Sequence, residues 1–204
     1  MTRMISPNGS HRDGFRCVSG YMCAIPMNLR DVILTIAEVG ICQIRWSPDV
    51  LDELERTYMK KSQVDASKAQ AGAKYLLGIM KDAFPEAMVE RDCYAHIVSA
   101  MPNDEKDRHV LAAAIASRAD VLVTANLKDF LVPAGFCYTD IQHPDDFLRY
   151  QLELAPQEFF HALKNLASNR HRPMNSVLGI LHSLQKTVPQ FVFQAQTMLP
   201  DLGA

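Results

Sequence analysis

The chain lacks the features of a secreted, membrane-spanning or strongly polyanion-binding protein. Its 21 basic and 23 acidic residues give a formal net charge of −2, so no general excess of positive charge attracts nucleic acid. No apolar run approaches the roughly 18–20 residues of a membrane span, and the N-terminus has no continuous apolar core like that of a signal peptide. We therefore expect a cytoplasmic protein with no membrane partner, in which any contact with nucleic acid is local.

The cysteines argue against a cysteine-based metal site and against a set of disulfide bonds. Five are present, an odd number, and none of their spacings matches a paired metal-ligand pattern. We expect them to be reduced thiols, as is usual in the cytosol. Cys42 and Cys137 lie in apolar surroundings, which favours burial as small hydrophobic side chains.

Caps, prolines and apolar spacing predict an α/β domain followed by helices. A helix is expected at 28–40 with Asn28 as its cap, a second from Ser47 and Pro48, and a third at 66–83. Strands are expected at 41–44, 119–124 and 137–139, and further helices at 143–154, 156–166 and 176–186. The apolar segment 191–193 is left as either a partner-facing patch or core, with core favoured.

The most informative stretch is 103–130, in which acids lie at both ends of one helix–strand unit. Asp107 is placed in the first turn of a helix, and Asn126 and Asp129 follow the carboxyl end of the next strand. Ligands of open α/β sheets bind at such strand ends, and a few convergent oxygens suffice for Mg²⁺. The alternative is ordinary local chemistry, because acids favour the first turn of any helix and Asn is common in turns. His109, two residues past Asp107 on the helix, is expected to have a structural role.

Four segments resemble the PIN domain family, and within it the VapC-type toxins. They are 29–34, 45–54, 107–115 and 119–130, in the family's order. Segments 144–148 and 156–160 more loosely resemble a C-terminal extension found in one PIN subgroup. The resemblance implies an α/β, PIN-like three-layer fold with a central parallel sheet and a C-terminal helical extension. We accordingly divide the chain into an atypical N-terminal segment at 1–21, a PIN-like domain at 22–140 and an extension at 141–204.

The resemblance also implies a function and a site. Such proteins are metal-dependent endoribonucleases, and the toxin of a module is paired with a cognate antitoxin and forms a homodimer. The implied catalytic residues are Glu53, Asp107 and Asp129, and the implied ligands of Mg²⁺ or Mn²⁺ are these three together with Asn126. For contact with RNA we select the neighbouring cations Lys106, Arg108 and Lys128.

One acid of the family pattern is missing. The family's first strand ends in Asp, and counting back from Leu29 places that position at about Gly20, whereas the segment 16–22 has no carboxylate. Residues 1–20 also lack the apolar run of a central buried strand, so we expect the first strand to be lost through a shifted frame or misplaced start. The missing acid leaves open a weak or inactive PIN-like module that binds antitoxin or RNA. A third possibility is a DNA-directed nuclease, because it would use the same acids.

Overall fold

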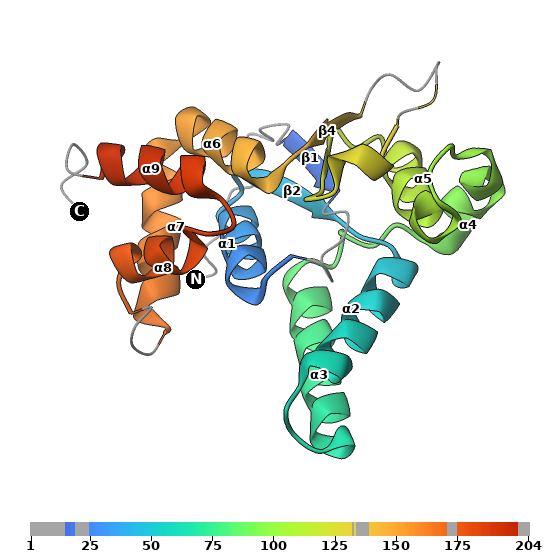
Figure 1. The fold of residues 1–204 in the computed structure, drawn as a ribbon, viewed down its shortest axis with the longest axis horizontal. Coiled ribbons are helices and arrows are strands. Elements are labelled where there is room, and N and C mark those ends of the chain that lie inside the picture. Colours follow the sequence, from blue (N-terminus) through green and yellow to red (C-terminus); the bar gives the residue numbers. More distant parts are fainter. Residues whose placement is uncertain (1–14, 19–24, 132, 134–138, 171–174, 200–204) are drawn as a thin grey trace, which may run out of the picture.

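A parallel four-stranded sheet lies at the centre of the computed structural model, which describes residues 15–18, 25–131, 133, 139–170 and 175–199 (Figure 1). The strand order is β2-β1-β3-β4, with every neighbouring pair parallel. The strands are β1 (Phe15–Val18), β2 (Cys42–Arg45), β3 (Val121–Val123) and β4 (Asp140–Gln142). Helices in the segments that connect the strands pack against the sheet, as in other α/β folds.

The expectation that the first strand is lost is wrong. Strand β1 pairs with β2 from Phe15 to Val18, and its last two residues also pair with β3. A short strand between two parallel neighbours is stabilised by backbone hydrogen bonds on both edges, which do not depend on a long apolar run. The sheet therefore begins inside the segment predicted to be atypical, before the expected domain start at residue 22. The position of the missing acid, Gly20, lies outside the described residues.

Helices α1 (Met27–Glu38), α2 (Pro48–Lys61) and α3 (Ala66–Ala83) follow the predicted order. Ser47 caps α2 as predicted, because the Val50 amide donates to its hydroxyl oxygen at 3.3 Å. The start of α1 differs from the prediction: the cap position is Pro26, and Asn28 lies within the first turn. Helices α2 and α3 pack together as a hairpin that projects from the sheet (Figure 1).

The chain then returns to the sheet through short elements. These are α4 (Arg91–Tyr94), η1 (Ala95–Ala100), η2 (Glu105–Asp107), α5 (Arg108–Ala116) and η3 (Leu127–Asp129), in which η denotes a 3₁₀ helix. Five residues of α5 are buried: Val110, Leu111, Ala112, Ala113 and Ala114. The helix contacts α2, α4 and β3, and this burial fixes its N-terminal end beside the end of β3.

Four helices form the C-terminal part: α6 (Pro144–Leu154), α7 (Pro156–Ser168), α8 (Val177–Leu184) and α9 (Pro189–Met198). Helix α7 packs on α1, and Arg170 forms an ion pair with Asp31 of α1. Helix α9 was not predicted; Phe191 and Val192 are core residues, as favoured, whereas Phe193 is exposed. The last strand starts at Asp140, later than the expected 137–139, and residues 137 and 138 lie outside the described residues.

One continuous apolar core joins the sheet, its covering helices and the C-terminal helices. Cys42 is buried in this core, as predicted, and Cys137 is outside the described residues. Among the helices that the structure describes, none combines the length and apolar character that crossing a membrane would require.

Candidate active site

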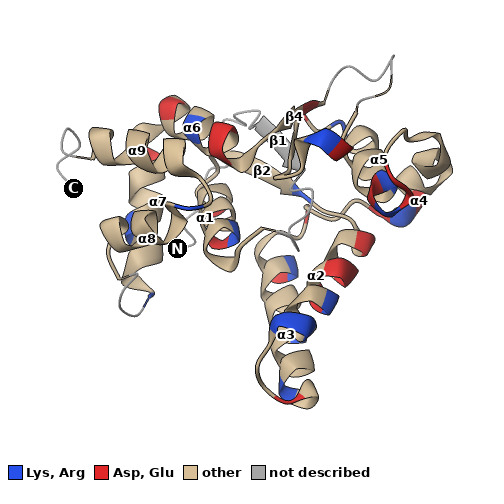
Figure 2. Cartoon of the chain, in the orientation of Figure 1, with Lys and Arg blue, Asp and Glu red and all other residues tan. Residues whose placement is uncertain are grey.

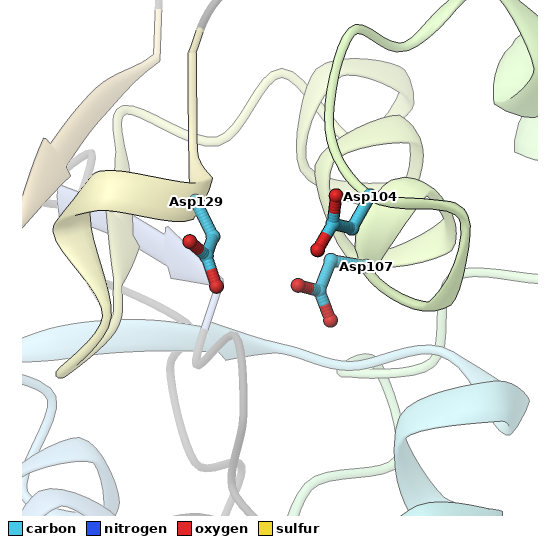
Figure 3. Close-up of side chains that lie close together, drawn as sticks. All are labelled: Asp104, Asp107 and Asp129. Atoms are coloured by element: carbon cyan, nitrogen blue, oxygen red, sulfur yellow. The ribbon is translucent and has the colours of Figure 1, made fainter.

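Three carboxylates converge where α5 begins and β3 has ended. Asp104, Asp107 and Asp129 each offer one carboxylate oxygen, and these oxygens all lie within 4.8 Å of one another. Asp104 immediately precedes η2, Asp107 is its last residue, and Asp129 is the last residue of η3. Figure 3 shows the first two projecting from one turn toward Asp129 on the opposite side. We refer to these three residues as the acidic cluster.

Asp107 is the most deeply buried member of the cluster. Its side chain is 1% exposed, and neither carboxylate oxygen has a hydrogen-bond partner. Burial raises the pKa of this carboxyl, and the charge of Asp129 raises it further, whereas His109 acts in the opposite direction. A buried carboxylate that accepts no hydrogen bond is costly to the fold, so its presence points to a role outside the fold's own hydrogen bonding.

The ordinary explanation for an acid at a helix start does not apply to Asp107. It occupies the cap position of α5, yet its side chain accepts no capping hydrogen bond. Its backbone continues the turn of η2 and is not in the extended conformation typical of a capping residue. The carboxylate is therefore directed into the acidic cluster and not onto the amides of its own helix.

Asp129 is held from two sides by asparagine side chains. The Asn126 amide donates to the Asp129 carboxylate, and the Asn103 amide donates to the Asp129 carbonyl oxygen at 2.5 Å. The Asn126 backbone amide in turn donates to the Thr124 hydroxyl at 3.1 Å, at the end of β3. Asp107, Asn126 and Asp129 thus lie together, as their spacing predicts, and Asn103 joins the two loops that carry them.

Glu53 lies beside the cluster but is not a member of it. On α2, its carboxylate oxygen is 3.6 Å from Nε2 of His109 on α5, an ion pair only when the imidazole is protonated. His109 in turn influences the pKa of Asp107. The structure therefore connects Glu53 to the acidic cluster through His109, a neighbour that the spacing on the helix did not predict.

The three predicted cations differ in their surroundings. Lys106 is exposed, with its ammonium nitrogen 4.0 Å from Asp107, and Lys128 is exposed beside Asp129. Arg108 is half-buried and donates from Nε to the Asn103 carbonyl oxygen at 3.0 Å, so it holds the loop before η2. Figure 2 shows acidic (red) and basic (blue) segments side by side around the start of α5. Positive charge that could attract a polyanion is therefore confined to a few side chains next to the acids.

Asp104 and Asn103 are absent from the predicted set of site residues. The resemblance matches only Asp107 in this turn, in which Asp104 and Glu105 are further acids. A detectable sequence feature was the three-residue spacing of Asp104 and Asp107, because side chains three apart eclipse each other in a 3₁₀ turn. That turn, followed by burial of α5, directs both carboxylates to the same side.

The donor set fits a hard divalent cation. Carboxylate oxygens are the ligands of Mg²⁺ and Mn²⁺, and one or two of them usually suffice, with water completing the coordination. The two unpartnered oxygens of Asp107 supply the specific observation, since a cation would satisfy both. Within the described residues, the cluster is therefore a donor set that can hold such an ion.

Comparison with known proteins finds two family models that match parts of the chain. Residues 17–128 match the family model described as a PIN domain, and residues 144–197 match the model described as the VapC50 C-terminal domain. The chain is 39% identical over 109 residues to "Putative ribonuclease VapC50" of Mycobacterium tuberculosis (strain ATCC 25618 / H37Rv). This match covers 53% of the chain and 64% of that relative, so it spans less than two thirds of the relative's length. No solved structure matches the chain.

Proposed function

Because the chain belongs to the PIN domain family, we propose that it is a metal-dependent endoribonuclease, the toxin of a toxin–antitoxin module acting in the cytoplasm. The observation that carries the proposal is the buried Asp107 carboxylate, whose two oxygens have no hydrogen-bond partner and one of which lies within 4.8 Å of an Asp129 carboxylate oxygen. Families of this kind act on RNA with divalent ions, and the relative in M. tuberculosis is named as a ribonuclease.

Asp107 and Asp129 are the proposed ligands of Mg²⁺, or of Mn²⁺ in its place. When bound, the ion polarises the scissile phosphodiester and lowers the pKa of an attacking water. Asn126 belongs to the same proposed set and also holds the Asp129 carboxylate, so its loss would misplace a ligand as well as remove one. Burial of Asp107 keeps bulk water from one side of the site and strengthens its attraction for a cation.

Glu53 is the second proposed acid, and its partner His109 suggests how it contributes. The Glu53 carboxylate lies 3.6 Å from Nε2 of His109 and pairs with it when the imidazole is protonated, and the imidazole acts to lower the raised pKa of Asp107. Lys106 and Lys128, both exposed beside the cluster, are the proposed contacts for RNA phosphates. Arg108 shapes the loop through Asn103 and contributes to RNA binding indirectly.

Cleavage of a mixed RNA by the purified protein in Mn²⁺ and in EDTA tests this function. We expect cutting that requires the metal, is lost in Asp107→Asn and is retained in Glu105→Gln, an exposed acid two residues away. A parallel single-stranded DNA of similar length distinguishes a ribonuclease from a DNA-directed enzyme. Equal cleavage in EDTA, or in Asp107→Asn, would contradict a metal-dependent reaction at this site.

The second candidate is a PIN-like module that binds antitoxin or RNA with little or no catalysis. The observation in its favour is the absence of any carboxylate in the segment 16–22, where the family supplies its first acid. Cleavage that appears only in Gly20→Asp would identify an enzyme weakened by that absence. Binding of RNA or antitoxin without cleavage in either form would support the module.

The cognate antitoxin and a homodimer are also part of the proposal. A small reading frame beside the encoding gene, whose product co-purifies with this chain and suppresses RNA cleavage, would support the toxin assignment. The mass of the purified chain in solution, measured with and without that product, tests the dimer separately.

A further inference from the structure

We propose that Asp104 is an additional ligand of the divalent ion, supplying a carboxylate in place of the one that the segment 16–22 lacks. This inference rests on the proposed function, because it names a further residue of the same metal site. It departs from the pattern implied by the resemblance, in which the turn before this helix contributes Asp107 alone. Three observations carry it: the placement of Asp104, its lack of a capping bond, and the rigidity of its loop.

Asp104 is placed to bind the same cation as Asp107 and Asp129. One oxygen from each of the three lies within 4.8 Å of the others, and Figure 3 shows the Asp104 carboxylate facing into the space between them. Oxygens bound to one Mg²⁺ at about 2.1 Å are separated by roughly 3–4 Å. Small rotations of exposed Asp104 and half-buried Asp129 therefore bring all three within the range of a single ion.

Neither acid of this turn serves the turn itself. Asp104 occupies the cap position of η2 and Asp107 that of α5, and neither side chain accepts a capping hydrogen bond. Asp107 is the independent indication of a ligand, since its side chain is 1% exposed and aimed into the cluster with both oxygens unpartnered. Among the described residues, the ammonium of exposed Lys106 lies 4.0 Å from the Asp107 carboxylate, and one ammonium does not balance three carboxylates.

The loop that carries Asp104 is fixed on both sides. Asn103 donates to the Asp129 carbonyl oxygen, Arg108 donates to the Asn103 carbonyl oxygen, and the Asp107 amide donates to the Asp104 carbonyl oxygen at 2.8 Å. These bonds hold the three like charges close before any ion arrives. A site that keeps carboxylates together against their repulsion is preorganised for a cation.

Titration of the metal-free protein with Mn²⁺, followed by calorimetry or by the electron paramagnetic resonance of free Mn²⁺, tests the assignment without using activity. We expect Asp104→Asn to weaken Mn²⁺ binding at least about tenfold. Glu105→Gln, which removes the same charge from the adjacent residue, is the matched control and should stay within about twofold. Asp107→Asn should remove binding at this site.

Replacing the oxygen ligand by sulfur adds a readout that a structural role would not give. Thiolates favour soft ions, so Asp104→Cys should lose Mn²⁺ affinity and gain a Cd²⁺ site with thiolate-to-metal ultraviolet absorption. Glu105→Cys, tested in parallel, should not gain that absorption beyond what the native cysteines contribute. Circular dichroism of each variant confirms that it is folded.

The outcomes separate the two proposals. If Asp107→Asn loses Mn²⁺ while Asp104→Asn and Asp104→Cys bind it like the parent, the metal site stands and Asp104 is not a ligand. If the parent binds no Mn²⁺ at all, both the metal site and the role of Asp104 are overturned. An equal loss in Asp104→Asn and Glu105→Gln would show only a general charge effect and would also reject the assignment.

Discussion

Replacing Asp107 by Asn should stabilise the metal-free protein, although it removes a proposed ligand. The carboxylate is buried, has no hydrogen-bond partner, and lies within 4.8 Å of two other carboxylates in the acidic cluster. Two unit charges at that separation repel by about 3 kcal/mol at an effective dielectric constant of about 20. The favourable charge of Lys106, 4.0 Å from the carboxylate, offsets part of this, so we expect a net gain of about 1–2 kcal/mol from the neutral amide.

The direction of the pH dependence follows from the raised pKa of Asp107. Because the native carboxyl binds its proton more tightly than the unfolded one, the free energy of unfolding decreases as pH rises from the ordinary value of 3.8 through the raised folded-state pKa. Above that window the parent carries the full penalty, and Asp107→Asn carries none. The difference in stability between the two proteins should therefore be largest near neutral pH and should shrink toward pH 4.

Thermal unfolding in EDTA from pH 4 to pH 8 measures this effect. For a chain of 204 residues, a gain of about 1–2 kcal/mol corresponds to a rise in Tm of about 2–8 °C at pH 7. Mn²⁺ at about 100 times its Kd should then stabilise the parent by about 2.7 kcal/mol and leave Asp107→Asn unchanged, reversing their order. A lower Tm for Asp107→Asn than for the parent in EDTA would refute the reasoning, because it would show that the carboxylate is needed by the fold.

Three further predictions concern other parts of the chain. Asp145 of α6 accepts hydrogen bonds at 2.6 and 3.1 Å from two backbone amides in the first turn of α9, so Asp145→Ala should lower the free energy of unfolding by about 1–2 kcal/mol in chemical denaturation. The control is Asp146→Ala, which replaces an exposed acid of the same helix; equal losses in the two variants would show that the cap does not stabilise the fold. Lys106→Ala and Lys128→Ala should each weaken RNA binding and reduce the slope of log affinity against log salt by about 0.7, an expectation contradicted by unchanged slopes. Gly20→Asp should tighten Mn²⁺ binding in titrations, and no change would argue that this position does not face the cluster.

The local pattern determined the elements that carry the site. Ser47 and Pro48 defined the start of α2, the apolar run before Ser117 defined α5, and short β3 followed from its continuous apolar residues. These signals depend on neighbours within one turn or one strand, so they can be read from the chain. They placed Asp107 at a helix start and Asp129 after a strand, which is why the convergence of these two was predicted.

Only the tertiary structure decided what surrounds those two acids. Strand β1 exists because β2 and β3 supply hydrogen bonds on both of its edges, a stabilisation absent from its own residues. Asp104 joins the cluster because η2 is a 3₁₀ turn anchored by Asn103 to the loop after β3, and Glu53 meets His109 because α2 packs on α5. Each of these contacts joins segments far apart in the chain, and its energy depends on packing that no local sequence pattern records.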